Sequence, residues 1–265
     1  MSDQMHNSWN KKEVINNIRT QGYHVAENYF SESELAVAKK SLLDTLHYIK
    51  PDSETDLKKK YYQIKEYSDK LKSHWYDISP FNCEIMKCMH KPEAIEMTKK
   101  YFNTDVIFLS RTAIGAYDDT NDKLLLGHQE TAQMSVDHIA LWAPLYDSIK
   151  EKGEGGLRIY KDSHKHGFFE HFLEDGKQRW TERYTHVKSS VTDQFEQIDF
   201  DIKAGSAVFF ISSMIHCGYP VTKKNGLRLT MSERFNPLLK LPFLRDENAP
   251  LRMPYVGIDY NKITD

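Results

Sequence analysis

Apolar side chains recur at helical spacing through the first hundred residues, and polar capping signals separate the runs. Ser31 and Glu34 have the spacing of a capping box, with apolar positions three or four residues apart behind them. Pro92 fits the first turn of a helix, where proline is well accepted. Residues near Tyr23 favour a short extended piece instead. The predicted helices lie within 11–50, 56–73 and 92–101, in a helical region of about 1–104.

Beyond residue 105 the pattern changes to short apolar runs that are rich in β-branched and aromatic residues. Turn signals such as Gly153 to Gly156 and Asn225-Gly226 separate these runs. Most runs follow one another without a helical pattern between them, which favours antiparallel sheets over alternating βαβ units. We therefore expect a mainly β fold with N-terminal helices, in which an antiparallel sandwich or jelly roll occupies about 105–240. The expected strands lie at 106–109, 124–126, 139–142, 207–215 and 227–235.

Residues 166–188 break the strand pattern with a mixture of histidine, lysine and aromatic side chains. A segment of this length without regular periodicity is typical of an active-site lid, so we interpret it as an insertion over one end of the jelly roll. A chain of 265 residues is long enough for one large core, and β-sandwiches of this size commonly remain undivided. The expectation is a single domain over 1–265.

The composition limits the cellular location and the classes of binding partner that we expect. A hydrophobic fraction of 40% and a charged fraction of 28% are typical of soluble proteins, and no apolar run is long enough for a membrane span. A formal net charge of −2 gives no broad field for a polyanion, so nucleic acid is not an expected partner. The polar first thirty residues, and three cysteines without a Cys-x-x-Cys pair, favour a cytoplasmic location. We expect a small-molecule substrate, and the oligomeric state stays open.

The main chemical signal is the pair His128 and Glu130. Their H-x-E spacing puts two potential metal ligands on the same side of an extended chain. A lone H-x-E is frequent by chance, so its weight depends on His216, which follows 88 residues after His128 at the end of the expected strand 207–215. Two histidines and one carboxylate that leave open positions on one face of the metal form the facial triad of non-haem iron(II) oxygenases.

Several segments, in the same order, resemble the phytanoyl-CoA dioxygenase family. Gly127 to Glu130 resembles the family's W-H-Q-D, and Gly155 to Lys165 resembles its G-x-L-x-x-x-x-G-S-H-K stretch. Lys203 to Phe210, followed by His216 and then Arg228, resembles its A-G-D-x-x-x-F…H…R ending. Residues 21–35 and 141–145 extend the likeness over most of the chain.

The resemblance implies a double-stranded β-helix, or jelly-roll, fold. It also implies an oxygenase that binds iron(II), uses 2-oxoglutarate and O2, and releases succinate and CO2 while it hydroxylates a small-molecule metabolite. Its metal ligands would be His128, Glu130 and His216, with no catalytic residue beyond the metal site. Glu130 replaces the family's usual Asp and keeps the carboxylate. Halogenases of this superfamily have Gly or Ala at that position, so we expect an oxidation and not a halogenation.

The resemblance also implies cosubstrate contacts. Arg228 would hold 2-oxoglutarate, and Gln129 and Trp142 are further candidates, although a tryptophan on an apolar strand is also a common core residue. Gly127 replaces a common family Trp, and Gly218 replaces a Ser that often helps to hold the cosubstrate. These two departures indicate that the contacts to the cosubstrate are rearranged.

Three side chains are candidates for the substrate. Arg111 could face an anionic group of the substrate or of 2-oxoglutarate, and Arg158 and Phe168 lie in segments expected near the site and the lid. The lid and the N-terminal helices carry the weakest part of the resemblance. The substrate therefore stays undefined at this point.

The position of Arg228 restricts the path of the chain. Arg228 shares one face of the last strand with Thr230, Ser232 and Arg234, which fits either a polar interior or a solvated exterior. A simple hairpin at Asn225-Gly226 would place Arg228 roughly 23 Å from His216, too far for one small cosubstrate. We therefore expect residues 217–226 to cross between two sheets and Arg228 to point inward, towards His128.

Three other functions share parts of these signals. A zinc deaminase also begins with H-x-E, but it needs a downstream P-C-x-x-C that the chain lacks. A cupin-type metal-dependent enzyme that does not use 2-oxoglutarate would have no need of Arg228. A non-catalytic binding protein on the same fold would be expected to lose at least one of the three metal ligands.

Overall fold

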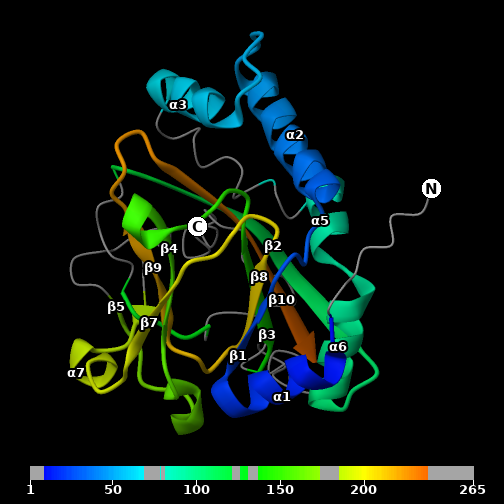
Figure 1. The fold of residues 1–265 in the computed structure, drawn as a ribbon, viewed down its shortest axis with the longest axis vertical. Coiled ribbons are helices and arrows are strands. Elements are labelled where there is room, and N and C mark those ends of the chain that lie inside the picture. The colour runs from blue at the N-terminus through cyan, green and yellow to red at the C-terminus, as the bar shows by residue number, and fades with distance from the viewer. Residues whose placement is uncertain are drawn as a thin grey trace, which may run out of the picture.

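Two antiparallel sheets face each other at the centre of the protein, with a cavity between them (Figure 1). In this computed structural model the described residues are 9–68, 78, 81–120, 126–130, 137–173 and 185–237. The larger sheet has the strand order β1-β8-β3-β10-β2 and the smaller one β7-β4-β9, while β5 and β6 form a separate pair. The strands are β1 (Tyr23–Ala26), β2 (Ile107–Asp118), β3 (Ile139–Pro144), β4 (Glu154–Tyr160), β5 (Phe172–Leu173), β6 (Thr185–His186), β7 (Gln197–Phe200), β8 (Ala207–Ile211), β9 (His216–Val221) and β10 (Leu227–Pro237).

Helices precede the sheets, as the apolar spacing predicts. The capping box is present: the Ser31 hydroxyl accepts from the Glu34 backbone N–H, and the Glu34 carboxylate accepts from the Ser31 N–H. Pro92 opens its helix as expected. The helices are α1 (Lys11–Gln21), α2 (Glu32–Ile49), α3 (Leu57–Tyr67), α5 (Cys83–Met89), α6 (Pro92–Phe102) and α7 (Ser189–Thr192), with 3-10 turns η3 (Lys150–Lys152) and η4 (Ser163–His166).

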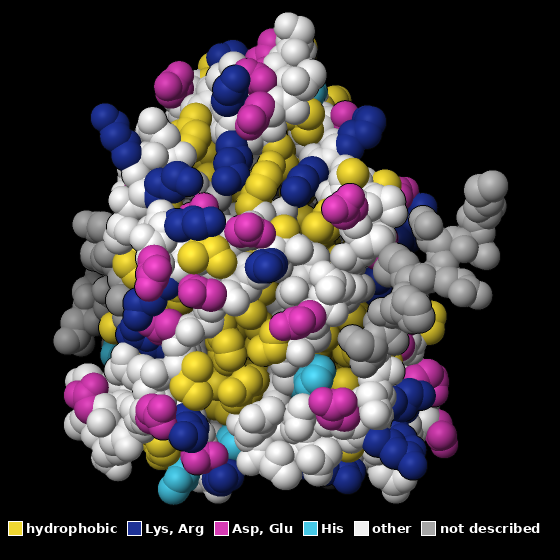
Figure 2. All heavy atoms as spheres, in the orientation of Figure 1, with side chains coloured by type: hydrophobic (Ala, Val, Ile, Leu, Met, Phe, Trp, Pro, Cys, Tyr) yellow, Lys and Arg dark blue, Asp and Glu magenta, His cyan; other side chains and the backbone are white. Residues whose placement is uncertain are grey.

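The N-terminal helices cover the larger sheet. Helices α1, α5 and α6 contact its strands, and α2 packs on α3 and α5 (Figure 1). Ile18, Leu42 and Met97 are fully or almost fully buried in the core that these layers share. On the molecular face in Figure 2, basic and acidic side chains are interspersed, and apolar side chains gather near its centre. Within the described residues, no helix has both the length and the apolar character that a membrane crossing requires.

The connection from β9 to β10 changes sheets. Strand β9 pairs with β4 in the smaller sheet, whereas β10 lies between β3 and β2 in the larger one. The turn between them contains Asn225 with φ 54°, and the Gly226 N–H donates to the carbonyl of Lys223 at 2.7 Å. The expected crossover at 217–226 is therefore confirmed.

One expected strand end is wrong. The run 207–215 does not form a single strand: β8 ends at Ile211, and His216 opens β9 in the other sheet. Ile211 pairs with Ile139, the first residue of β3, and the ladder between β3 and β8 ends at this pair. The backbone of 212–215 turns instead, with Met214 N–H donating to the Ile211 carbonyl.

Other strands differ from the prediction in length. Strand β2 extends to Asp118, far beyond the expected 106–109, because it pairs along most of β10. Gly155 and Gly156, interpreted as a turn, lie inside β4, where a Cβ on Gly156 would stand 2.2 Å from the Tyr219 hydroxyl oxygen. Strand β7 was not predicted. In the expected strand 124–126, residues 124 and 125 lie outside the described residues, and Leu126 is not in a strand.

Candidate active site

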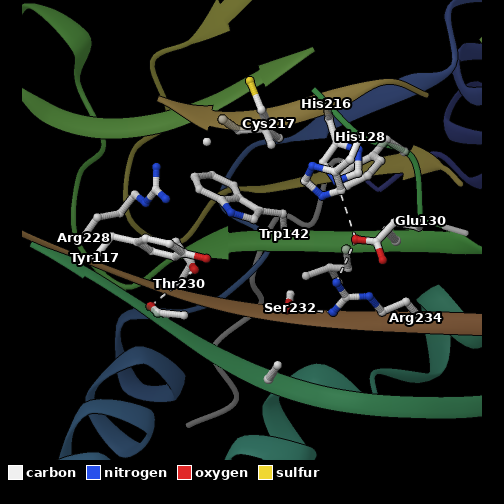
Figure 3. A pocket seen from close by; sticks show the side chains of 17 residues that line it. Tyr117, His128, Glu130, Trp142, His216, Cys217, Arg228, Thr230, Ser232 and Arg234 are labelled. Atoms are coloured by element: carbon white, nitrogen blue, oxygen red, sulfur yellow. Dashed lines mark hydrogen bonds and ion pairs between the residues drawn. The ribbon is translucent and has the colours of Figure 1, made fainter. Parts of the chain in front are cut away.

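The cavity between the sheets has a volume of about 150 Å³. Strand β10 lines it with the face that carries Arg228, Thr230, Ser232 and Arg234, so alternation directs the polar side of this strand inward. The opposite wall comes from β4 and β9. Figure 3 shows Arg228 at one end, Trp142 in the middle, and His128, Glu130 and His216 at the other end.

His128, Glu130 and His216 meet at one end of this cavity. One potential ligand atom from each side chain lies within 4.8 Å of those of the other two. Among the described residues, these three form the group of His, Cys, Asp or Glu side chains that could hold a metal ion. The Nε2 atom of His216 is 3.5 Å from Oε1 of Glu130. An isolated antiparallel bridge pairs the backbones of His128 and His216, with N–O distances of 3.0 and 2.9 Å. The backbone itself therefore brings together ligands that are 88 residues apart.

Hydrogen bonds orient both imidazole rings. The Nδ1 atom of His128 lies 3.0 Å from the Leu126 carbonyl, and Nδ1 of His216 lies 3.0 Å from the Met214 carbonyl. A carbonyl can only accept, so each Nδ1 carries the proton and each Nε2 presents a lone pair. This is the tautomer that an Nε2 metal ligand requires.

The protonation states also suit a cation. Burial is the main cause that lowers the pKa of His128 to about 4, and the neighbouring His216 acts in the same direction. Burial alone would raise the pKa of Glu130, but Arg234 and His216 outweigh it and hold this pKa well below its usual range. At neutral pH the site therefore offers a neutral imidazole and a carboxylate. Two nitrogen donors and one oxygen donor fit a divalent transition metal.

Arg228 lies at the far end of the cavity and is 5% exposed. Its Nη1 donates to the carbonyls of Gly156 at 2.6 Å and Tyr219 at 2.9 Å, and its guanidinium carbon is 4.3 Å from the centre of the Tyr117 ring. Contacts on several sides thus fix the guanidinium. Its side chain points inward from β10, as expected (Figure 3).

The structure adds residues that the sequence reasoning did not assign to the site. Tyr117 is the cross-strand partner of Arg228, and this long-range pairing leaves no signal in the local sequence. Thr230, Ser232 and Arg234 could have been found, because they alternate with apolar positions on the same face as Arg228. Arg234 donates from Nη2 to Oε1 of Glu130 at 2.8 Å and from Nη1 to Ser232 at 2.9 Å.

Of the other cosubstrate candidates, Trp142 lines the cavity and Gln129 does not. The Gln129 side chain is buried behind the metal motif, where its amide nitrogen donates to the carbonyls of Gly167 and Ser213. Its oxygen accepts from the Phe169 N–H. Gln129 therefore anchors the 167–169 segment and does not face the cavity in which the cosubstrate is expected.

The three substrate candidates do not gather in the cavity. Arg158 points away from it, because Leu157 takes the inward position of β4, and its guanidinium binds Asp199. Phe168 is 36% exposed and is not part of the cavity wall. The side chain of Arg111, and residues 174–184 of the expected lid, lie outside the described residues.

Gly127 and Gly218, the two glycines that depart from the family pattern, have different surroundings. A Cβ on Gly127 would stand 3.0 Å from Thr192 and 3.2 Å from Tyr160, so no tryptophan fits there. Gly218 lines the cavity without a side chain of its own. The hydroxyl groups nearest the Arg228 end come instead from Tyr117 and from Thr230 (Figure 3).

The sequence profile of the family described as phytanoyl-CoA dioxygenase (PhyH) matches residues 18–225, well over half of the chain. The chain belongs to the phytanoyl-CoA dioxygenase family. The resemblance inferred from the motifs is thereby confirmed, and with it the enzyme class, a 2-oxoglutarate-dependent oxygenase. No curated protein matches the chain by sequence.

Solved structures with the same fold are distant in sequence. EvdO2 from Micromonospora carbonacea var. aurantiaca is 13% identical with a TM-score of 0.61, over 84% of this chain and 89% of its own. The epimerase SnoN, in complex with Fe3+, alpha ketoglutarate and nogalamycin RO, is 13% identical with a TM-score of 0.58, over 94% and 92%. AviO1 from Streptomyces viridochromogenes Tue57 is also 13% identical, with a TM-score of 0.57, over 91% and 97%. These similarities confirm the expected jelly-roll fold of the phytanoyl-CoA dioxygenase family.

Proposed function

We propose that this member of the phytanoyl-CoA dioxygenase family hydroxylates a small-molecule metabolite at an iron(II) site formed by His128, Glu130 and His216. The observation that carries the proposal is the convergence of these three side chains within 4.8 Å at one end of a cavity. Both imidazoles have Nε2 available in the required tautomer, and Glu130 is a carboxylate at neutral pH. The bound iron would supply O2 activation, and 2-oxoglutarate would supply two electrons as it is converted to succinate and CO2.

Arg228 would hold the distal carboxylate of 2-oxoglutarate. A guanidinium stays charged at any working pH and pairs with a carboxylate through two hydrogen bonds. The carbonyls of Gly156 and Tyr219 and the ring of Tyr117 hold this guanidinium in place, so little ordering is left to occur on binding. The hydroxyl of Thr230 lies along the same wall and could take the place of the family Ser.

Trp142 would separate the cosubstrate from bulk solvent. It lies between Arg228 and the three ligands in Figure 3, on the strand next to β10. A bulky aromatic wall in this position excludes water from the reacting groups. The three substrate candidates from the sequence gain no support from the cavity, so the substrate class is left at a small molecule. The SnoN structure contains nogalamycin RO, which is consistent with a small-molecule substrate here.

Two alternatives make different demands on the same residues. A cupin-type enzyme without 2-oxoglutarate would gain nothing from a buried arginine that points into the cavity. A non-catalytic binding protein on this fold would not need two oriented imidazoles and a carboxylate at one place. The three converging ligands and the inward Arg228 support the oxygenase over both alternatives.

The deciding experiment is a substrate screen that measures succinate released from 2-oxoglutarate in the presence of iron(II) and O2. Wild-type protein should release succinate with at least one compound of a metabolite panel, and His216→Ala should release none while keeping its far-UV circular dichroism. The ligands contribute little to the buried apolar surface, so the fold should survive the substitution. Equal turnover by wild type and His216→Ala would remove His216 from the site.

A further inference from the structure

Besides His216, Glu130 has a second neighbour, and this neighbour is charged. Arg234, at the metal end of the polar face of β10, donates to Oε1 of Glu130 at 2.8 Å. The same Oε1 atom is the one that lies 3.5 Å from Nε2 of His216. The carboxylate oxygen that lies beside His216 is therefore also the oxygen that accepts from the arginine (Figure 3).

Both members of this ion pair are largely buried. The side chain of Glu130 is 7% exposed and that of Arg234 is 14% exposed, and Ser232 fixes the arginine through its Nη1 atom. In such surroundings an ion pair is weakly screened, and removal of one partner leaves a buried charge that is strongly unfavourable. The single negative charge of Glu130 would therefore be shared between a guanidinium and a metal ion.

We propose that Arg234 is a positioning residue for Glu130 and that it weakens metal binding by competing for the charge of Oε1. The inference rests on the proposed metal site. Glu130 has one methylene more than the family's usual aspartate, so its carboxylate extends further from the backbone to meet Arg234. The glutamate in the H-x-E motif is therefore explained by its ion pair with Arg234.

Removal of Arg234 has two opposing effects on metal affinity. Without the arginine, Glu130 loses its orientation, which costs the entropy of ordering one side chain when the metal binds. Glu130 also loses its cation, so the metal becomes its main source of compensation. Leaving a buried charge unpaired costs far more than ordering one side chain, and the second effect should dominate. The metal should bind more tightly, although the metal-free protein becomes less stable.

Calorimetric titration with Mn(II), which is stable in air, measures which of the two effects on metal affinity is larger. Arg234→Met should bind Mn(II) at least tenfold more tightly than wild type, and its metal-free form should unfold at a lower temperature. Arg234→Lys, which keeps the charge, should remain within about threefold of wild type. The matched control is Arg228→Met, an arginine on the same strand and in the same cavity, whose Mn(II) affinity without 2-oxoglutarate should also stay within about threefold.

A second comparison needs no metal. In Glu130→Gln, no carboxylate remains to be compensated, so adding Arg234→Met should cause little further loss of thermal stability. A role of Arg234 in packing alone would destabilise both backgrounds equally and would leave Mn(II) affinity unchanged. If Arg234→Met does not fold, Arg234→Gln carries the same predictions with a smaller change in shape.

The outcomes separate the two proposals. If wild type binds Mn(II), His216→Ala does not, and Arg234→Met binds no more tightly than wild type, only the inference about Arg234 is overturned. If wild-type protein does not bind Mn(II) at all, the metal site itself is wrong and the inference is overturned with it. Tighter binding by Arg234→Met together with reduced metal-free stability supports the competition.

Discussion

At the scale of single residues, backbone carbonyls prepare the site for its chemistry. His128 and His216 each place Nδ1 at 3.0 Å from the carbonyl two residues earlier, so the same local geometry sets both tautomers. The carbonyls belong to Leu126 and Met214, which could be exchanged for other residues without loss of these contacts. Because the orienting atoms are main-chain atoms, their identity leaves no trace in the sequence.

Arg228→Met should weaken the binding of 2-oxoglutarate at least tenfold. Methionine fills similar space but offers no donor, and a charge-assisted pair is worth about 1.5–3 kcal/mol, which is a factor of ten or more in affinity. Titration of Mn(II)-loaded protein with 2-oxoglutarate measures the effect. An unchanged dissociation constant would remove Arg228 from the cosubstrate site.

The residues that could be predicted from the sequence are those whose chemistry shows in a motif. His128, Glu130 and His216 carry a recognisable spacing, and the structure brings them together. Gln129 lies within the same motif, yet its side chain points to the other side of an extended backbone and binds Ser213. Proximity in sequence to a ligand does not by itself place a side chain in the cavity.

At the scale of elements, β10 organises the site. It lies between β3 and β2, and its inward face runs from Arg228 to Arg234. The alternation of polar and apolar residues was visible in the sequence, but the direction of the polar face was not. Only the second sheet, which turns that side of the strand into a cavity wall, decides it. The same applies to β2, whose length follows from its pairing with β10 and not from its own composition.

Helix α3 is tied to the end of β2 through the fully buried side chain of Asp118. Its carboxylate accepts from the Tyr61 hydroxyl at 2.8 Å and from Lys65 at 2.9 Å. Burial alone would raise the pKa of Asp118, but hydrogen bonds from Thr120, Lys65 and Tyr61 outweigh it and lower the pKa from 3.8 to about 2. The folded protein therefore holds this group ionised at pH values where the unfolded chain would protonate it.

Asp118→Asn should remove a pH-dependent part of the stability. Because the folded pKa is the lower one, the stabilisation is fully present above pH 3.8 and is lost as the pH falls towards about 2. The free energy of unfolding should drop by on the order of 2 kcal/mol at neutral pH. Urea unfolding of both proteins between pH 7 and 2 measures the difference. A gap that stays constant down to pH 2 would show that the carboxylate charge does not tie α3 to the sheet.

At the scale of the whole molecule, the site depends on two sheets and on segments that are distant in sequence. His128 stands in a bridge outside the named strands, His216 opens β9 in the smaller sheet, and Arg228 lies on β10 in the larger one. The helical region, the β character and the change of sheet between β9 and β10 could be predicted. The end of β8 at Ile211 could not, because it depends on where its partner strand begins.

Because the site spans both sheets, its ligands should stabilise the whole fold. A ligand that binds only the folded state at a concentration 100 times its dissociation constant adds about 2.7 kcal/mol to the free energy of unfolding. For a protein of 265 residues this corresponds to a rise in Tm of roughly 5–10 °C. Mn(II) at such a concentration should therefore raise the Tm of wild type by that amount in differential scanning fluorimetry. 2-Oxoglutarate should add a further rise when Mn(II) is present and give far less on its own.

Variants at the two ends of the cavity show how much of the rise in Tm comes from each end. His216→Ala should lose the response to Mn(II), and with it most of the response to 2-oxoglutarate, because the cosubstrate would lose its metal contact. Arg228→Met should keep the response to Mn(II) and lose only the increment from 2-oxoglutarate. Equal Tm shifts in wild type and His216→Ala would mean that the ligands bind elsewhere. A full 2-oxoglutarate increment in Arg228→Met would mean that the cosubstrate does not extend across the cavity to β10.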